Sequence, residues 1–166
     1  AMGEYIPAKL GMDAGEKPLF MNIQNTLREG FNYVFIFENG KGVRIPEKAY
    51  ETSGFRRKLK GACSTASPVV EIFSEEEKKP FELMLINSDN RAIIIKTSLI
   101  VQKTTRTSIG SQIMTLKGNT TITRALADFE AVFENTKGYR KLKLPATPVA
   151  LTGKDAKEQQ MSIDEI

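Results

Sequence analysis

A fifty-residue repeat constrains this 166-residue chain more than any other feature of its sequence. When the sequence is shifted by fifty positions, KPLFMNIQ (17–24) aligns with SPVVEIFS (67–74), and YVFIFENGKGVRI (33–45) aligns with LMLINSDNRAIII (83–95). A basic loop follows at corresponding positions in both copies, GFRRKLKGA (54–62) in the first and TTRTSIGSQ (104–112) in the second. A constant period of this length is typical of proteins built from repeated supersecondary units.

Each unit reads as a set of short strands. Residues 33–37 are aromatic or β-branched, the ENG sequence that follows favours a tight turn, and residues 43–45 continue as the second strand of a hairpin. We also expect strands at 18–23 (PLFMNI) and at 113–116 (IMTL). The sequence thus predicts an all-β chain with propeller-like blades of four antiparallel strands, about fifty residues per blade.

Three units can be assigned, at about 17–66, 67–117 and 118–150, followed by a polar C-terminal tail at 151–166. The third unit is irregular, and its segment 123–135 also has some helical spacing. Because two or three units cannot close a ring, we expect a fragment of a larger ring. A plain β-sandwich with coincidental spacing is the alternative.

Composition argues against an enzyme that acts alone. The chain has no histidine, no P-loop and no GxGxxG motif, so we expect no metal, no cofactor and no catalytic residue. Its single cysteine, Cys63, excludes an internal disulfide framework and is expected to be a structural thiol in a cytoplasmic protein. No apolar run approaches the roughly 20 residues of a membrane helix, and no secretory signal begins the sequence.

Positive charge is unevenly distributed along the chain. Residues 91–117 contain five cations and no acid, and residues 41–60 contain seven cations against two acids, although the net charge of the whole chain is only +4. Clustering of this kind favours a surface that binds a polyanion, and an ordinary solvated surface is the alternative.

The candidate phosphate contacts lie in the two basic loops, near the hairpin turns and in a third cluster near residue 140. They are Arg56, Arg57, Lys58, Lys60, Lys103, Arg106, Lys117, Lys41, Arg91, Arg140 and Lys141. The hydroxyls of Thr104, Thr105, Thr107 and Ser108 could donate further hydrogen bonds.

The stretches NYVFIFENGKGVRIPEKAY, RAIIIKTS, TTRTSIGSQIMTLK and YRKLKLPATPVALTGKD resemble the C-terminal domain of the A subunit of bacterial type IIA topoisomerases, namely DNA gyrase and topoisomerase IV. The resemblance runs over nearly the whole chain. It implies a partial β-pinwheel, a propeller-like ring whose neighbouring blades exchange strands and whose basic rim bends duplex DNA.

The implied partners are double-stranded DNA, bound without sequence preference, the remainder of the topoisomerase A subunit and its ATPase B subunit. The resemblance places the DNA-cleaving tyrosine upstream of this chain and the protein at the nucleoid. The Gln-Arg-Arg-Gly-Gly-Lys-Gly box of gyrase is absent. Because that box belongs to a first blade that this fragment would lack, the sequence does not separate gyrase from topoisomerase IV. The rival hypothesis is a propeller-like protein-interaction module.

Overall fold

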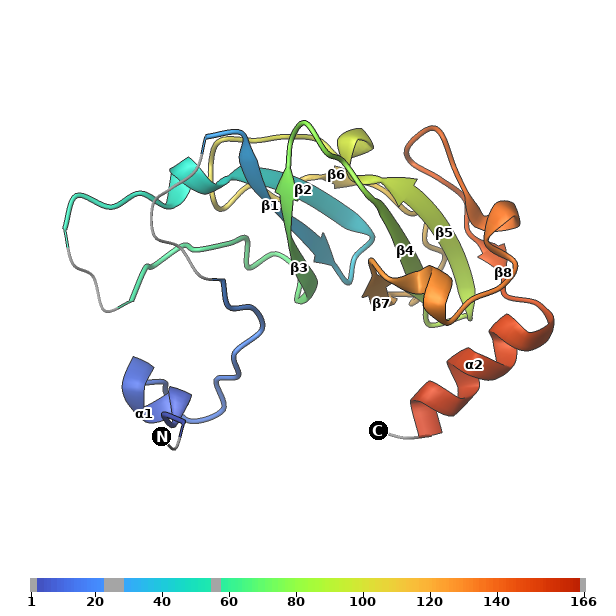
Figure 1. Ribbon diagram of the computed structural model, residues 1–166, viewed down its shortest axis with the longest axis horizontal. Helices are drawn as coiled ribbons and strands as arrows, with labels where there is room; N and C mark the ends of the chain where they lie inside the picture. The colour runs from blue at the N-terminus through green and yellow to red at the C-terminus, as the bar shows by residue number, and fades with distance from the viewer. Residues whose placement is uncertain (1–2, 23–28, 55–57, 165–166) are drawn as a thin grey trace.

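The computed structural model describes residues 3–22, 29–54 and 58–164. Strands dominate its central part, and a helix lies near each end (Figure 1). The strands are β1 (Phe31–Phe37), β2 (Lys41–Pro46), β3 (Val69–Glu76), β4 (Glu82–Asn87), β5 (Arg91–Lys96), β6 (Ser111–Gln112), β7 (Ile122–Leu126) and β8 (Val149–Ala150). The α-helices are α1 (Ile6–Leu10) and α2 (Gly153–Asp164), and the 3-10 turns are η1 (Glu47–Tyr50), η2 (Thr97–Leu99), η3 (Phe129–Ala131) and η4 (Thr136–Tyr139).

The strands form two four-stranded antiparallel sheets, which lie side by side in Figure 1. The first sheet has the order β3-β1-β2-β6 and the second the order β7-β4-β5-β8. The all-β prediction is therefore confirmed. The fifty-residue period is visible as well, because β2 starts at Lys41 and β5 at Arg91, and each strand runs into a 3-10 turn.

Each sheet is assembled from two consecutive sequence units. The hairpin β1–β2 of the first unit is flanked by β3 and β6, both of which come from the second unit. In the same way the hairpin β4–β5 is flanked by β7 and β8, which come from the third unit. The third unit has no hairpin of its own, since η3 and η4 occupy the corresponding stretch.

The strand expected at 18–23 is not formed, because residues 17–22 are not in a strand and residue 23 lies outside the described residues. The corresponding strands β3 and β7 pair with the hairpin of the preceding unit, and no described hairpin precedes β1. Phe20 instead packs edge to face on Tyr33, with ring centroids 5.6 Å apart. The strand expected at 113–116 was misplaced, since β6 ends at Gln112.

Strand alternation divides the apolar side chains between two faces of each sheet. Val34 and Ile36 of the first sheet join Leu83 and Leu85 of the second in one buried core. The opposite face of the second sheet, which includes Met84, packs against residues from η3, η4 and the segments around them.

The tail, expected only to be polar, folds into helix α2 and contacts this outer face of the second sheet. Asp155 is buried and accepts three hydrogen bonds: from the Tyr139 hydroxyl at 2.9 Å, the Glu134 amide at 2.8 Å and the Asn135 amide at 3.1 Å. The Asp155 carboxylate therefore joins α2 to the last unit. The segment 123–135, whose secondary structure the sequence left ambiguous, contains most of β7 and all of η3.

Replacing Asp155 by Ala should lower the free energy of unfolding by about 2–4 kcal/mol, because it removes charge-assisted hydrogen bonds at a buried position. Urea unfolding measures the change. Lys154→Ala is the control, since its ion pair with Glu134 is exposed and is worth at most about 1 kcal/mol. Equal losses for the two variants would contradict this role of Asp155.

Candidate nucleic-acid interface

Two segments of equal length bulge from equivalent edges of the two sheets. In the first sheet, Gln102 bridges to Arg44, the chain then leaves the sheet over residues 103–110, and it returns as β6. In the second sheet, Arg140 bridges to Ile94, and the chain leaves over residues 141–148 before returning as β8. We call residues 103–110 and 141–148 the two rim segments.

Both rim segments begin at a lysine held by the same backbone contact. The Lys103 amide donates to the Arg44 carbonyl at 2.9 Å, and the Lys141 amide donates to the Ile94 carbonyl at 2.8 Å. Arg44 and Ile94 are themselves fifty residues apart. The two lysines therefore occupy equivalent positions on neighbouring sheets.

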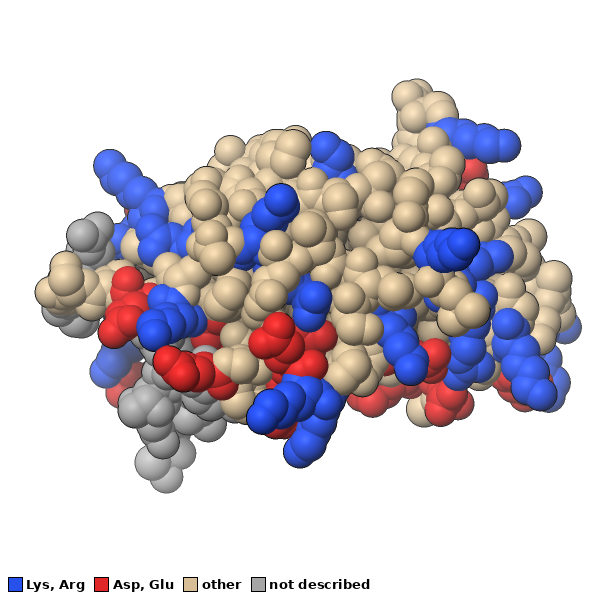
Figure 2. Space-filling model, turned by 90° about the horizontal axis from the view of Figure 1, so that it is seen from above, with Lys and Arg blue, Asp and Glu red and all other residues tan. Residues whose placement is uncertain are grey.

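The rim segments carry cations and no acids. Their sequences, KTTRTSIG and KLKLPATP, contain four Lys or Arg and no Asp or Glu. The segments lie along the upper side of the molecule in Figure 1. Figure 2 looks onto this side, where Lys and Arg side chains are spread along the length of the molecule and most of the acidic side chains visible in the view lie in its lower half.

A shallow pocket lies where the first rim segment meets the preceding basic loop. Its volume is about 350 Å³, and its lining includes Lys60, Gly61 and the segment from Thr104 to Thr107. Lys60 and Lys103 have no ion-pair partner among the residues that the structure describes. The predicted cations of two consecutive repeats are thus brought together.

Arg106 holds these two loops against each other. Its Nη1 donates to the Ala49 carbonyl at 2.9 Å, its Nε donates to the Gly61 carbonyl at 3.3 Å, and its guanidinium lies 6.0 Å from the centre of the Tyr50 ring. These contacts fix the position of the guanidinium, so its positive charge stays beside Lys60.

The remaining cations of the basic loop are either paired or outside the described residues. Lys58 donates to Asp13 at 2.7 Å and to Glu16 at 3.2 Å, and these bonds raise its pKa. The exposed pair is broken at little cost. Arg56 and Arg57 lie outside the described residues.

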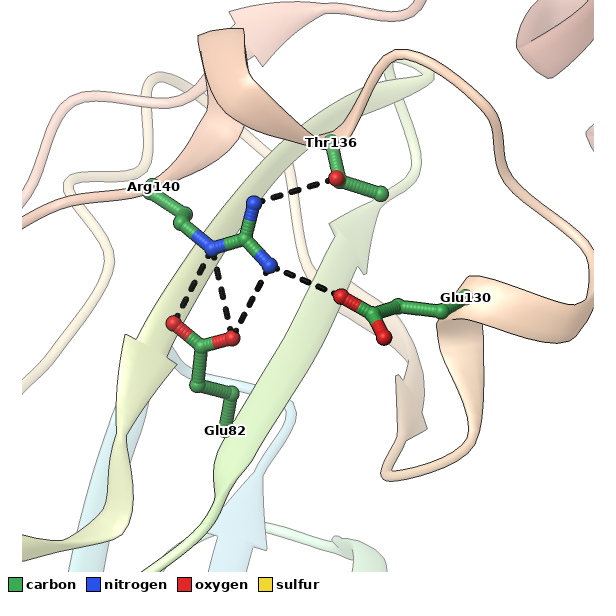
Figure 3. Close-up of polar contacts among 4 residues, drawn as sticks. All are labelled: Glu82, Glu130, Thr136 and Arg140. Carbon is green, nitrogen blue, oxygen red and sulfur yellow. Dashed lines mark hydrogen bonds and ion pairs between the residues drawn. The ribbon is translucent and has the colours of Figure 1, made fainter.

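Arg140 is engaged in an ion-pair cluster rather than projecting freely into solvent. Figure 3 shows its guanidinium between Glu82, which it contacts through Nε at 3.0 Å and Nη2 at 3.0 Å, Glu130 at 2.9 Å and Thr136 at 3.1 Å. The two carboxylates raise the pKa of Arg140. A phosphate would have to compete with both of them.

The Arg140–Glu82 pair has an uncharged counterpart in the first sheet. There Gln102 donates through Nε2 to the Asn32 side chain at 2.8 Å, and these two residues stand at the equivalent bridge and strand positions. In both sheets, a side chain at the start of the hairpin, Asn32 or Glu82, holds by a side-chain contact the residue that comes just before the rim segment.

Lys41, Arg91 and Lys117 lie away from the lysines that begin the rim segments, although Arg91 reaches the Pro148 carbonyl at the far end of the second segment. Lys41 and Arg91 are the first residues of β2 and β5, at the hairpin-turn end, whereas the rim lysines bond near the middle of the same strands. Arg91 and Lys117 line a shared concavity at that end. The predicted cations therefore divide between two regions.

The hydroxyls of Tyr50 and Tyr139 and the thiol of Cys63 show no activation. Burial is the main cause that raises the pKa of Tyr50, whose hydroxyl donates to the Ala62 carbonyl at 2.7 Å. Burial likewise raises the pKa of Tyr139 and of the Cys63 thiol. A raised pKa reduces the population of the anionic nucleophile at neutral pH.

The equivalence of the two rim segments is not apparent from the sequence. A comparison at a constant offset of fifty aligns residues 54–62 with 104–112 but cannot relate 104 to 142, because the third unit lacks a hairpin. The sequence also did not predict the contacts of Asn32 with Gln102 and of Glu82 with Arg140, because the residues of each pair lie far apart along the chain.

None of the described helices is long and apolar enough to cross a membrane. No family model and no curated protein sequence matches the chain. A solved C-terminal domain of DNA topoisomerase IV is similar in structure, with a TM-score of 0.59, 20% sequence identity, and coverage of 74% of this chain and 38% of that one. A DNA gyrase A C-terminal domain gives a TM-score of 0.53 and 14% identity, over 76% of this chain and 41% of that one.

These likenesses confirm, at the level of the fold, the resemblance inferred from the sequence. The chain has the fold of those C-terminal domains and spans about two fifths of the length of each.

Proposed function

We propose that this chain is a DNA-binding part of the C-terminal domain of a type IIA topoisomerase A subunit. In this role its rim segments hold duplex DNA while the rest of the enzyme carries out ATP-dependent strand passage. The observation that carries the proposal is the pair of acid-free rim segments, which start at equivalent lysines on neighbouring sheets. The fold shared with topoisomerase C-terminal domains supports it.

The proposed contacts are electrostatic and read no bases. DNA phosphates recur along each strand, so cations repeated from blade to blade can meet successive phosphates. Lys60, Lys103, Arg106 and Lys141 would provide the charges, and the threonine hydroxyls of the first rim segment would add hydrogen bonds. We do not include Arg140, since two carboxylates already engage it.

We further propose that the fragment itself has no catalytic residue and serves a larger cytoplasmic, nucleoid-associated enzyme. Its partners would be the remainder of the A subunit and the ATPase B subunit. Units 17–66, 67–117 and 118–150 would then be successive blades of one pinwheel, each contributing flanking strands to the blade before it.

Fluorescence anisotropy with two duplexes of unrelated sequence tests the DNA-binding step. With about four to six phosphate contacts, the logarithm of the affinity should fall against the logarithm of salt concentration with a slope of about −4 to −5, equally for both duplexes. A flat salt dependence would contradict the mechanism. Failure to bind either duplex at moderate salt would favour the protein-interaction module.

A further inference from the structure

The concavity at the hairpin-turn end of the second sheet adjoins the C-terminal end of the second rim segment, which contributes Thr147 and Pro148 to it, and lies apart from Lys103 and Lys141. It has a volume of about 350 Å³, and its walls come from the β4–β5 turn, the loop between β6 and β7, and the residues just before β8. The residues that line it are Asn87, Asp89, Arg91, Thr115, Lys117, Thr120, Thr147 and Pro148. Its volume is at the small end of the range for small-molecule sites, about 300–1,000 Å³.

The two sheets differ at the residue that pairs with the first residue of β2 and of β5. In the first sheet Lys41 pairs with Gln112, whose Nε2 reaches over the turn and donates to the Asn39 carbonyl at 3.0 Å and to the Met114 carbonyl at 2.7 Å. In the second sheet Arg91 pairs with Ala150. The methyl group of Ala150 cannot fill the space that the glutamine side chain occupies in the first sheet.

In the first sheet, the Gln112 side chain packs directly against the backbone of the turn at Gly40. A Cβ atom on Gly40 would contact the Gln112 amide nitrogen and would lie 2.7 Å from the Met114 carbonyl oxygen. In the second sheet the residue at the matching place in the turn is Asn90, with a positive φ of 53°. The turn geometry is thus retained, but the side chain that covers it is not.

The open space is lined by groups that bind oxyanions. Arg91 and Lys117 have no ion-pair partner in the described part of the chain, and the Arg91 guanidinium makes only a long contact, 3.5 Å, with the Pro148 carbonyl. Three threonines contribute hydroxyl groups to the lining. Arginine, lysine and hydroxyl donors together are the usual recognition groups for phosphate.

The acid in the site is already hydrogen-bonded. The Thr120 hydroxyl lies 3.0 Å from Asp89 Oδ2 and 2.6 Å from the Lys117 carbonyl oxygen, so its single proton is already engaged by these two acceptors. The buried Asn87 side chain accepts the backbone amides of Asp89 at 3.1 Å and Arg91 at 3.0 Å and so fixes the turn. With two cations and one carboxylate, the lining keeps a net positive charge.

We propose that this concavity binds a phosphate group, through Arg91, Lys117 and the hydroxyls of Thr115 and Thr147. The ligand is a small phosphorylated molecule, and the carboxylate of Asp89 accepts a hydrogen bond from a hydroxyl or amino group beside the phosphate. A backbone phosphate of DNA has the same chemistry, so the experiment separates the two sources.

The test uses the full chain and a substitution that copies the first sheet into the second. Ala150→Gln places at the second turn the side chain that closes the first, at an exposed position, without removing any charge. Inorganic phosphate and pyrophosphate are titrated into the isotope-labelled protein, and backbone amide shifts of residues 87–91 and 115–121 are followed by NMR. We expect saturable shifts in the parent and affinity at least about fivefold weaker in Ala150→Gln.

A second variant, Arg91→Gln with Lys117→Gln, removes the charges and leaves Ala150 unchanged. It should weaken phosphate binding by at least about tenfold, since two charge-assisted contacts are lost. Lys103→Gln is the matched control on the rim and should leave the titration unchanged. The inference is overturned if the parent shows no saturable shifts at these residues, or if Ala150→Gln binds phosphate as the parent does.

Duplex binding by Ala150→Gln identifies the source of the phosphate. Unchanged DNA affinity assigns the site to a free phosphorylated ligand, whereas a loss of DNA affinity assigns it to the path of the duplex. The site and the proposed function can therefore fail separately: phosphate titration tests the concavity, and binding of DNA by the rim is tested by salt dependence.

Discussion

Changing Lys60, Lys103 and Lys141 together to Gln is expected to weaken duplex DNA binding by about two orders of magnitude at about 0.1 M salt. Each phosphate contact contributes about 0.9 to the slope of log affinity against log salt concentration, so the slope should become less negative by about 2–3. The three lysines have no ion-pair partner among the described residues, and their ammonium groups are free to contact phosphate. Anisotropy titrations over a range of salt concentrations measure both quantities.

The matched control removes the same amount of charge away from the rim. Lys9, Lys79 and Lys154 each form an exposed ion pair with a nearby acid, and changing all three to Gln alters the net charge equally. If binding depended only on the net charge of the molecule, the two triple variants would lose affinity to the same extent. That result would refute a rim-localised interface.

The repeat made the two hairpins predictable because each carries its own turn signal and its own apolar alternation. Gly40 and Asn90 both adopt positive φ in turns that the sequence marks, and the strands on either side contain the expected β-branched and aromatic residues. Local information of this kind is sufficient for a hairpin. It was insufficient for residues 18–23, because a flanking strand forms only where another unit provides an edge.

The functional prediction was limited in the same way. The sequence identified where cations cluster, but not which of them another chain segment had already engaged. Arg140 and Lys141 are adjacent in sequence, yet Arg140 is held by Glu82 and Glu130 while Lys141 begins a rim segment. The partners of Arg140 are up to 58 residues away in the sequence, and no local sequence pattern predicts them.

Helix α2 shows the same dependence on distant contacts. Residues 153–164 are polar on average, and the sequence suggested only a tail. Asp155 and Gln159 nevertheless become buried, because Tyr139 and Arg124 lie where those side chains can reach them, at 2.9 Å and 2.8 Å. Polar residues four apart on one helix face thus provide the contact with the last unit.

Replacing Arg44 by Leu should produce the largest loss of stability among the changes considered, about 3–5 kcal/mol in the free energy of unfolding. Glu75 is fully buried, and Arg44 Nη1 lies 3.4 Å from its Oε2 atom. Asn32 also donates to that oxygen at 3.2 Å, while Oε1 has no hydrogen-bond partner within the described structure. Without Arg44, a buried carboxylate would keep a single amide donor.

The double variant Arg44→Leu with Glu75→Leu separates this cause from simple loss of packing. Removing both charged groups removes the unpaired carboxylate, so the double variant should regain most of the stability and unfold within about 1–2 kcal/mol of the parent. Urea unfolding of the parent, both single variants and the double variant completes the cycle. If the losses of the single variants simply add, the buried pair is not coupled and the explanation fails.

The same substitution should affect the rim, because Arg44 connects the buried pair to the chain that leads into it. Its Nε donates to the Ile100 carbonyl at 2.8 Å, and its backbone carbonyl accepts the Lys103 amide at 2.9 Å. We expect hydrogen exchange at the Lys103 amide to accelerate in Arg44→Leu more than at the Lys141 amide, whose acceptor is Ile94 on the other sheet. Equal acceleration at both amides would indicate global unfolding and would contradict a local link between the buried pair and the first rim segment.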